Sequence, residues 1–109
     1  MNKYRTHNCS ELRKKDIDNI ISLSGWINKK RDHGNLLFID LRDNFGITQC
    51  IIDKGNKNFL DLEKTQLETV IKIEGKVVNR SNETVNKDIK TGEIEVAIDK
   101  FEILGTCKE

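Results

Sequence analysis

Four side chains in segments of alternating hydrophobicity are suited to contact with single-stranded nucleic acid: Arg31, Phe38, Gln49 and Glu95. Phe38 lies between Leu37 and Ile39, and period-two alternation therefore predicts that its ring faces away from the core that those neighbours fill. An aromatic ring on an open sheet face can stack on an unpaired base, a contact worth about 1 to 3 kcal/mol. The alternative is a second small core, with the ring beneath a loop or a neighbouring domain.

The three polar members of this set offer complementary hydrogen-bonding groups. Arg31 precedes a predicted hairpin loop at 32–35, and its planar guanidinium could pair with a phosphate or with the acceptor edge of guanine. Gln49 is the central polar side chain of the segment 47–52, so its amide either reads a base edge or hydrogen-bonds within the barrel. Glu95 would repel phosphate, yet a carboxylate can accept from N1–H and the amino group of unpaired guanine. Otherwise it is an exposed strand glutamate.

Residue types that support catalysis are present in patterns that favour structural roles. Asp40 and Asp43 flank Arg42, an arrangement more typical of a local ion pair than of a nuclease or metal site. The sequence contains no nucleophile elbow, P-loop or paired histidine motif. We therefore expect no catalytic residues, no metal and no cofactor in this chain.

The composition indicates one compact, polar domain covering residues 1–109, with 36% hydrophobic and 34% charged residues. No apolar stretch approaches the length of about 20 residues that crosses a bilayer, and the first residues lack the apolar core of a signal peptide, so we expect a cytoplasmic protein without membrane contact. Three widely spaced cysteines predict buried or inert thiols. A formal net charge of +1 excludes binding of nucleic acid through overall charge and requires a local site.

Alternation predicts five strands, at 20–30, 36–42, 47–53, 71–77 and 93–99. The hydrophobic phase shifts after Asp99, which predicts a bulge there. Ser10 is placed to cap a short helix that begins at Glu11, and the segment from about 56 to 65 is expected to form another. This order predicts an all-β fold with short helices: a five-stranded Greek-key barrel of the OB-fold type, with an N-terminal helix and a helix between strands 3 and 4.

Several motifs resemble the amino-terminal anticodon-binding domain of bacterial aspartyl-tRNA synthetases, and together they span essentially the whole chain. They are Tyr4-Arg5-Thr6-His7, Ser24-Gly25-Trp26-Ile27, Arg31-Asp32-His33-Gly34, the run from Leu37 to Asp43, Gly46-Ile47-Thr48-Gln49 and the run from Asn86 to Val96. The asparaginyl and lysyl enzymes share the barrel and the Gly-Trp strand, whereas the Thr-Gly-Glu-Ile-Glu-Val run is closest to the aspartyl type.

The resemblance implies roles for individual residues. Phe38 would stack on the central uracil of the anticodon, and Gln49 would hydrogen-bond to that base. Arg31 and Glu95 would read the guanine at the first anticodon position. Two further residues would lie near the third base and the backbone, namely Arg80 and Asn86, with a variable segment at 81–84 between them.

The resemblance also implies properties of a longer parent enzyme. The parent would be a class II enzyme that joins aspartate to tRNA-Asp with ATP and Mg²⁺, acting as a homodimer, and this chain would be its excised domain. In the bacterial enzymes that the chain resembles, a histidine at the loop position of His33 often accompanies charging of tRNA-Asn as well as tRNA-Asp, and the alternative is an ordinary hairpin histidine. The competing hypotheses are a free-standing single-stranded nucleic-acid binder and an OB-type domain that serves protein contacts.

Overall fold

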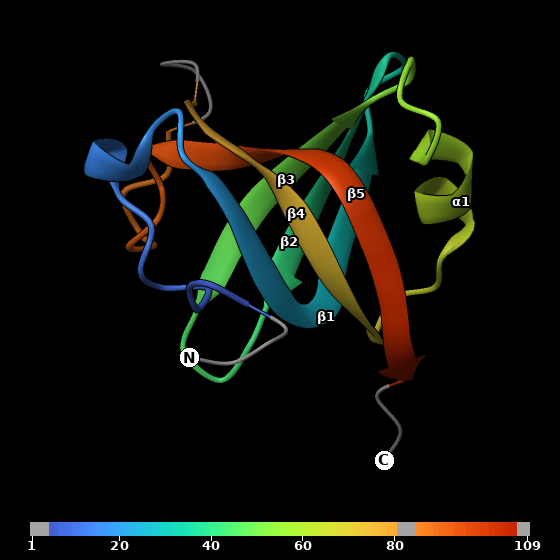
Figure 1. Cartoon of the computed structure of the whole chain (residues 1–109), viewed down its shortest axis with the longest axis horizontal. Helices are drawn as coiled ribbons and strands as arrows, with labels where there is room; N and C mark the ends of the chain where they lie inside the picture. Colours follow the sequence, from blue (N-terminus) through green and yellow to red (C-terminus); the bar gives the residue numbers. More distant parts are fainter. Residues whose placement is uncertain (1–4, 81–84, 107–109) are drawn as a thin grey trace.

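Five strands form a closed barrel in a computed structural model, which describes residues 5–80 and 85–106 (Figure 1). The strands are β1 (Ile20–Asp32), β2 (Leu36–Arg42), β3 (Ile47–Asp53), β4 (Thr69–Asn79) and β5 (Ile94–Thr106). Around the barrel they follow the order β1-β2-β3-β5-β4, with β3 and β5 parallel and the other neighbours antiparallel. The prediction of a mostly β, five-stranded OB-fold domain is confirmed.

Alternation within each strand separates the barrel interior from its outer surface. In β2, Leu37, Ile39 and Leu41 are buried in the core, whereas Phe38 and Asp40 between them are only half-buried. This arrangement follows from the pleat, which turns successive side chains to opposite faces of the sheet. The outward position predicted for Phe38 is confirmed.

The bulge predicted near Asp99 is present in the pairing of β4 with β5. Glu74 pairs with Lys100 and Gly75 pairs with Ile98, so Asp99 has no partner of its own in the ladder. The extra residue changes which side chains of β5 face inward beyond this point, and it accounts for the phase shift in the sequence.

One short α-helix, α1 (Phe59–Lys64), lies between β3 and β4, within the segment 56–65. The side-chain amides of Asn56 and Asn58 donate to the backbone oxygen of Asp99 at 3.2 and 3.1 Å. These bonds attach the beginning of the helical connection to the bulge in β5, and Phe59 and Leu62 of α1 are buried against the barrel.

The prediction of a helix after Ser10 is wrong. Residues 9–11 form a turn, and the nearest helical element is a single 3₁₀ turn, η1 (Lys14–Asp16). The Ser10 hydroxyl donates to Oδ1 of Asn8 at 3.0 Å, which also accepts from the Ser10 amide, so the serine closes a local turn and caps no helix. Arg13 donates to the carbonyl oxygen of Ser10, which occupies an acceptor that a helix would use.

Two of the three cysteines lie within the described residues, Cys9 and Cys50, and both are free and buried. Burial raises the pKa of each thiol above its usual value. The prediction of buried thiols is confirmed for this pair, whereas Cys107 lies outside the described residues. Among the helices of the described region, none is long and apolar enough to span a bilayer.

Candidate nucleic-acid interface

The barrel brings the four predicted residues together on its outer surface, from four different strands. Arg31 lies near the end of β1 and Phe38 is its partner in β2, while Gln49 is on β3 and Glu95 is on β5. Phe38, Gln49 and Glu95 follow the parity of the outward-facing positions, since their strand neighbours Ile39, Cys50 and Val96 are fully buried. Residues separated by 64 positions in the sequence thus share one face.

Hydrogen bonds join the polar members of this face into one network. The guanidinium of Arg31 donates to both carboxylate oxygens of Asp40 at 3.2 Å and to Oε1 of Gln49 at 2.9 Å. The amide Nε2 of Gln49 donates in turn to Oε1 of Glu95 at 2.7 Å. A network in which each member has a charged or amide partner fixes the orientation of every side chain before a ligand arrives.

Gln49 takes part in hydrogen bonds within the protein at the centre of this network. This side chain is 4% exposed and hydrogen-bonds within the protein, linking Arg31 to Glu95. Arg31 and Glu95 are more accessible, and the Arg31 side chain retains 37% of its exposure. A guanidinium has five N–H donors and a carboxylate has about four acceptor sites, so these two groups keep capacity for a ligand. The outer face therefore presents the Arg31 guanidinium as a hydrogen-bond donor and the Glu95 carboxylate as an acceptor, both held in place by Gln49.

A groove with a volume of about 320 Å³ runs beside this network. Its walls come from β1, β2, β3 and the connection between β4 and β5: Lys29, Arg31, Asp40, Ile47, Gln49, Arg80, Asn86 and Ile89. Polar and charged groups form most of the lining, to which Ile47 and Ile89 add apolar side chains. A groove of this kind suits a polar, planar ligand with an anionic backbone.

Arg80 is the most buried of the charged residues that line the groove. It is 8% exposed, and its Nε donates to the carbonyl oxygen of Ile94 at 3.0 Å. Burial lowers the pKa of the Arg80 guanidinium, and the neighbouring carboxylates of Glu95 and Asp40 oppose that shift. The guanidinium stays charged, because arginine does not deprotonate in proteins.

Asn86 lies on the exposed rim of the same groove. Its Oδ1 accepts from the backbone amide of Asp88 at 2.9 Å, which shapes the local loop. The variable segment at 81–84 lies outside the described residues. The expectation of third-base contacts there therefore stays a prediction.

Phe38 and His33 lie next to each other beyond the groove, at the hairpin end of β2. Their ring centroids are 4.8 Å apart with an interplanar angle of 69°, an edge-to-face contact. Phe38 is half-buried and His33 is exposed. The groove lining does not include Phe38, so the ring adjoins the polar network as a separate apolar surface.

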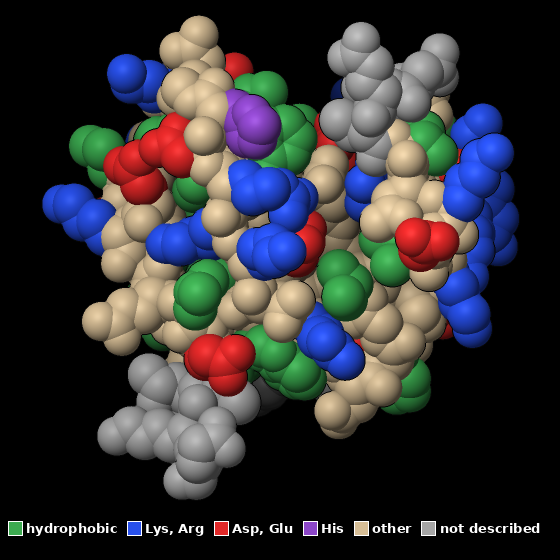
Figure 2. All heavy atoms as spheres, turned by 180° about the vertical axis from the view of Figure 1, so that it is seen from behind, with side chains coloured by type: hydrophobic (Ala, Val, Ile, Leu, Met, Phe, Trp, Pro, Cys, Tyr) green, Lys and Arg blue, Asp and Glu red, His purple; other side chains and the backbone are tan. Residues whose placement is uncertain are grey.

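Viewed from the side on which β2 and β3 lie, the surface concentrates Lys and Arg side chains near its centre, with hydrophobic and acidic side chains interspersed (Figure 2). This local concentration reconciles a net charge of only +1 with an anionic ligand. Within residues 5–80 and 85–106, no group of three His, Cys, Asp or Glu side chains is placed to hold a metal ion.

Asp40 is a member of the network that the sequence did not predict. The expected partner was its neighbour Arg42, but the ion pair is made with Arg31 across the β1–β2 ladder. The sequence does indicate that Asp40 faces outward, because it shares the parity of Phe38 in β2. The register that brings it opposite Gln49 and within reach of Arg31 requires tertiary structure.

Comparison with known sequences identifies the family. The family model described as a tRNA anticodon OB-fold nucleic acid binding domain matches residues 21–104. Aspartate–tRNA(Asp/Asn) ligase of Pelagibacter ubique (strain HTCC1062) is 72% identical over 109 residues, which is 100% of this chain and 18% of that protein. The ligase of the same description from Rhodopseudomonas palustris (strain BisB5) is 50% identical over the same shares. The chain thus spans less than a fifth of these curated relatives, and the resemblance to aspartyl-tRNA synthetases is confirmed.

Solved structures share the fold at lower sequence identity. Asparaginyl-tRNA synthetase from Pyrococcus horikoshii, complexed with asparaginyl-adenylate, is 24% identical with a TM-score of 0.75, and the match covers 92% of this chain and 22% of that one. OBody AM2EP06, bound to hen egg-white lysozyme, is 18% identical with a TM-score of 0.78, covering 97% of this chain and 98% of that one. The outward network, the barrel and the family match lead to one conclusion: this chain belongs to the family of tRNA anticodon-type OB-fold nucleic acid binding domains.

Proposed function

We propose that this chain is the anticodon-binding domain of an aspartate–tRNA ligase and that its ligand is the anticodon loop of tRNA-Asp. The observation that carries the proposal is the fixed network from Arg31 through Gln49 to Glu95, open to a groove on the outer surface of the barrel. The names of the relatives support the same function. A free-standing nucleic-acid binder is the less favoured alternative.

Arg31 and Glu95 read the first anticodon base in this proposal. Guanine carries acceptors at O6 and N7 and donors at N1–H and its amino group. A guanidinium matches the acceptors and a carboxylate matches the donors, whereas adenine would present its amino group where guanine presents O6. The distance between the two side chains is set by Gln49, which contacts both.

Phe38 stacks on the central base, and Gln49 contributes its remaining amide hydrogen to that base. The ring supplies affinity with little base preference, because every base has a π-face. The amide supplies a preference among bases, because the amide hydrogen needs an acceptor on the base. Gln49 would therefore act twice, once as the link between Arg31 and Glu95 and once as a reading group.

Arg80 and Asn86 contact the third base or its backbone from the far wall of the groove. His33 is exposed in the hairpin loop, where its ring contacts Phe38. The family resemblance at this loop position supports a relaxed choice of the third base. On this basis we propose that the parent charges tRNA-Asn in addition to tRNA-Asp. Charging assays with the full-length enzyme test this point, and aspartylation of tRNA-Asp alone would refute it.

The parent activity rests on the same proposal. The parent enzyme would join aspartate to tRNA with ATP and Mg²⁺, as a cytoplasmic homodimer. Within that enzyme, this chain would bind and orient the tRNA.

Titration with short stem-loop RNAs tests the proposed function. The expected result is preference for a loop with guanine and uracil at its first two anticodon positions over loops with those bases replaced. Binding should be weak with a shallow salt dependence, because few phosphates are neutralised by a chain of net charge +1. Equal affinity for all loops would favour the free-standing binder, and no RNA binding would favour a role in protein contacts.

A further inference from the structure

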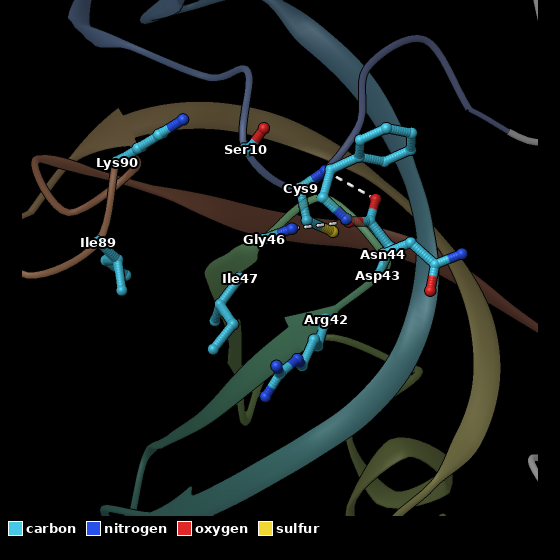
Figure 3. Close-up of a pocket in the computed structure, with 10 residues that line it drawn as sticks. Cys9, Ser10, Arg42, Asp43, Asn44, Gly46, Ile47, Ile89 and Lys90 are labelled. Atoms are coloured by element: carbon cyan, nitrogen blue, oxygen red, sulfur yellow. Dashed lines mark hydrogen bonds between the residues drawn. The ribbon is translucent and has the colours of Figure 1, made fainter.

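A second cavity adjoins the groove at the opposite end from Phe38 and is not used by the proposed contacts. It has a volume of about 300 Å³, opens to solvent and is bordered by the turn between β2 and β3, the segment around Cys9 and the loop at 89–90 (Figure 3). Ile47 and Ile89 line both this cavity and the groove, so the two hollows share one apolar boundary. A ligand that fills the groove can continue into the cavity across these two side chains.

The cavity lies in line with the proposed reading residues. Phe38, Asp40 and Arg42 occupy successive outward positions of β2, and Ile51, Gln49 and Ile47 are their partners in β3. Arg42 is four residues beyond Phe38, about 14 Å at the usual rise of a strand. The strand pair thus leads from the stacking ring, past the polar network, to the cavity.

The charge at the mouth of the cavity is positive. Arg42 and Lys90 line it, and both are exposed. The carboxylate in its wall, Asp43, is held by the protein: Oδ1 accepts from the amides of Phe45 and Gly46 at 2.8 and 3.1 Å, and Oδ2 accepts from the amide of Cys9 at 2.9 Å. Its negative charge is therefore directed into the wall, while the two basic side chains remain free to move toward a ligand.

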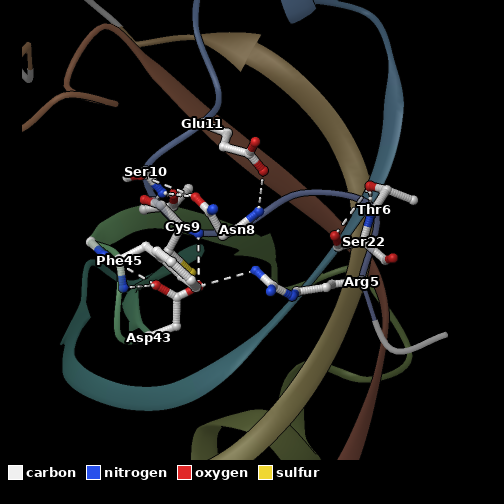
Figure 4. A network of polar contacts seen from close by, with 11 residues as sticks. Arg5, Thr6, Asn8, Cys9, Ser10, Glu11, Ser22, Asp43 and Phe45 are labelled. Atoms are coloured by element: carbon white, nitrogen blue, oxygen red, sulfur yellow. Dashed lines mark hydrogen bonds and ion pairs between the residues drawn. The ribbon is translucent and has the colours of Figure 1, made fainter. Parts of the chain in front are cut away.

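The wall is closely packed and carries a further basic side chain, Arg5, which is paired with Asp43. Arg5 forms an ion pair with Asp43 at 3.9 Å, and its guanidinium lies 5.3 Å from the centre of the Phe45 ring (Figure 4). A side chain at Gly46 would approach the Cβ atom of Ser10 to 2.9 Å, which shows how closely the two segments pack. A cavity with a fixed wall, a basic rim and an apolar floor fits a phosphodiester with its ribose.

We propose that this cavity is a sequence-independent subsite for the RNA backbone, in which Arg42 and Lys90 hold the phosphate of a nucleotide that flanks the three anticodon bases. The inference rests on the proposed function, which supplies the RNA. It predicts a binding contribution that does not depend on base identity, in contrast to the network around Gln49.

The double variant Arg42→Ala/Lys90→Ala tests the subsite in titrations with stem-loop RNAs at several salt concentrations. Each single-strand phosphate contact contributes about 0.7 to the slope of log K against log salt, so loss of this one phosphate contact should lower the slope by about 0.7 and the affinity at about 0.1 M salt by about 5-fold. The loss should be equal for a loop with guanine and uracil at the first two anticodon positions and for a loop with both replaced. Far-UV circular dichroism and thermal unfolding should match the wild type, since both side chains are exposed.

Two controls separate a local subsite from overall charge. Lys57→Ala/Lys64→Ala removes the same two charges from exposed positions in and beside α1, on another side of the barrel, and it should leave the slope unchanged (Figure 1). Arg42→Lys/Lys90→Arg keeps both charges and should retain most of the slope. An unchanged slope in the alanine pair, or an equal fall in the α1 pair, overturns the subsite while the base preference of the wild type still stands. A wild-type chain that binds no stem-loop overturns the proposed function, and the subsite falls with it.

Discussion

The two faces of the β2–β3 ribbon differ in what their side chains contact, although they alternate along the same residues. The inner face carries Leu37, Ile39 and Leu41, which are sealed in the core. The outer face carries Phe38 and Asp40, which contact a hairpin histidine and the Arg31 network. The difference teaches that stability and recognition are assigned to adjacent residues in this barrel. Substitutions one position apart should therefore have separable effects.

The inner face should give the largest effect. Ile39→Ala removes a fully buried side chain from the centre of the barrel and leaves a cavity, so we expect a loss of about 2 to 5 kcal/mol in the free energy of unfolding. Urea titration followed by circular dichroism measures it. The remaining folded fraction should bind RNA with unchanged affinity. A loss below about 1 kcal/mol would mean that the core relaxes around the site and that the contrast between faces is overstated.

The neighbouring outward residue should show the opposite pattern. Phe38→Ala removes the stacking ring, and we expect binding of the stem-loop to weaken by about 1 to 3 kcal/mol while the unfolding midpoint changes little. Phe38→Tyr retains the ring and serves as the matched control. Collapse of the circular dichroism spectrum in Phe38→Ala would show that the ring is a core residue.

The acceptor of the network should control base preference more than affinity. Glu95→Gln keeps the shape of the side chain and replaces one acceptor oxygen by an amide donor, which opposes the donors of guanine. We expect the preference for guanine over adenine at the first position to fall by about 1 to 3 kcal/mol. Competition between the two stem-loops measures this ratio directly. A ratio equal to that of the wild type removes Glu95 from base reading.

The smallest expected effect concerns Asp40, which orients Arg31 without a proposed contact to RNA. Asp40→Asn keeps the size of the side chain and removes the ion pair, and because both partners are partly exposed we expect a loss of about 0.5 to 1 kcal/mol in binding. A double-mutant cycle with Arg31→Ala isolates the coupling. If Asp40→Asn has the same effect with and without Arg31, the positioning role is contradicted.

Local alternation was sufficient to predict much of this fold. The bounds of β2 and β3 match their predicted ranges, because each has an uninterrupted period-two pattern between turn residues. The bulge at Asp99 was predictable because it leaves a trace in the sequence, a change of hydrophobic phase. The outward positions of Phe38 and Glu95 follow from the same parity argument.

Features that depend on side chains from distant segments cannot be predicted from local alternation. Ser10 has the chemistry of a helix cap, but Asn8 and Arg13 occupy the groups that a helix would need. Asp40 pairs with Arg31 only because the hairpin brings them together, and the hydrogen bond from Gln49 to Glu95 forms only because the barrel places β5 beside β3. Sequence identified the participants of the site, and tertiary structure assigned their partners.

Backbone amide chemical-shift mapping of the isotopically labelled chain tests most directly whether the outer face of β2, β3 and β5 contacts RNA. On addition of a stem-loop with guanine and uracil at the first two anticodon positions, the largest shifts should occur around Arg31, Phe38, Gln49 and Glu95, with little change in α1. Shifts that centre on α1, or that spread evenly over the barrel with the same pattern for every loop sequence, would contradict the account.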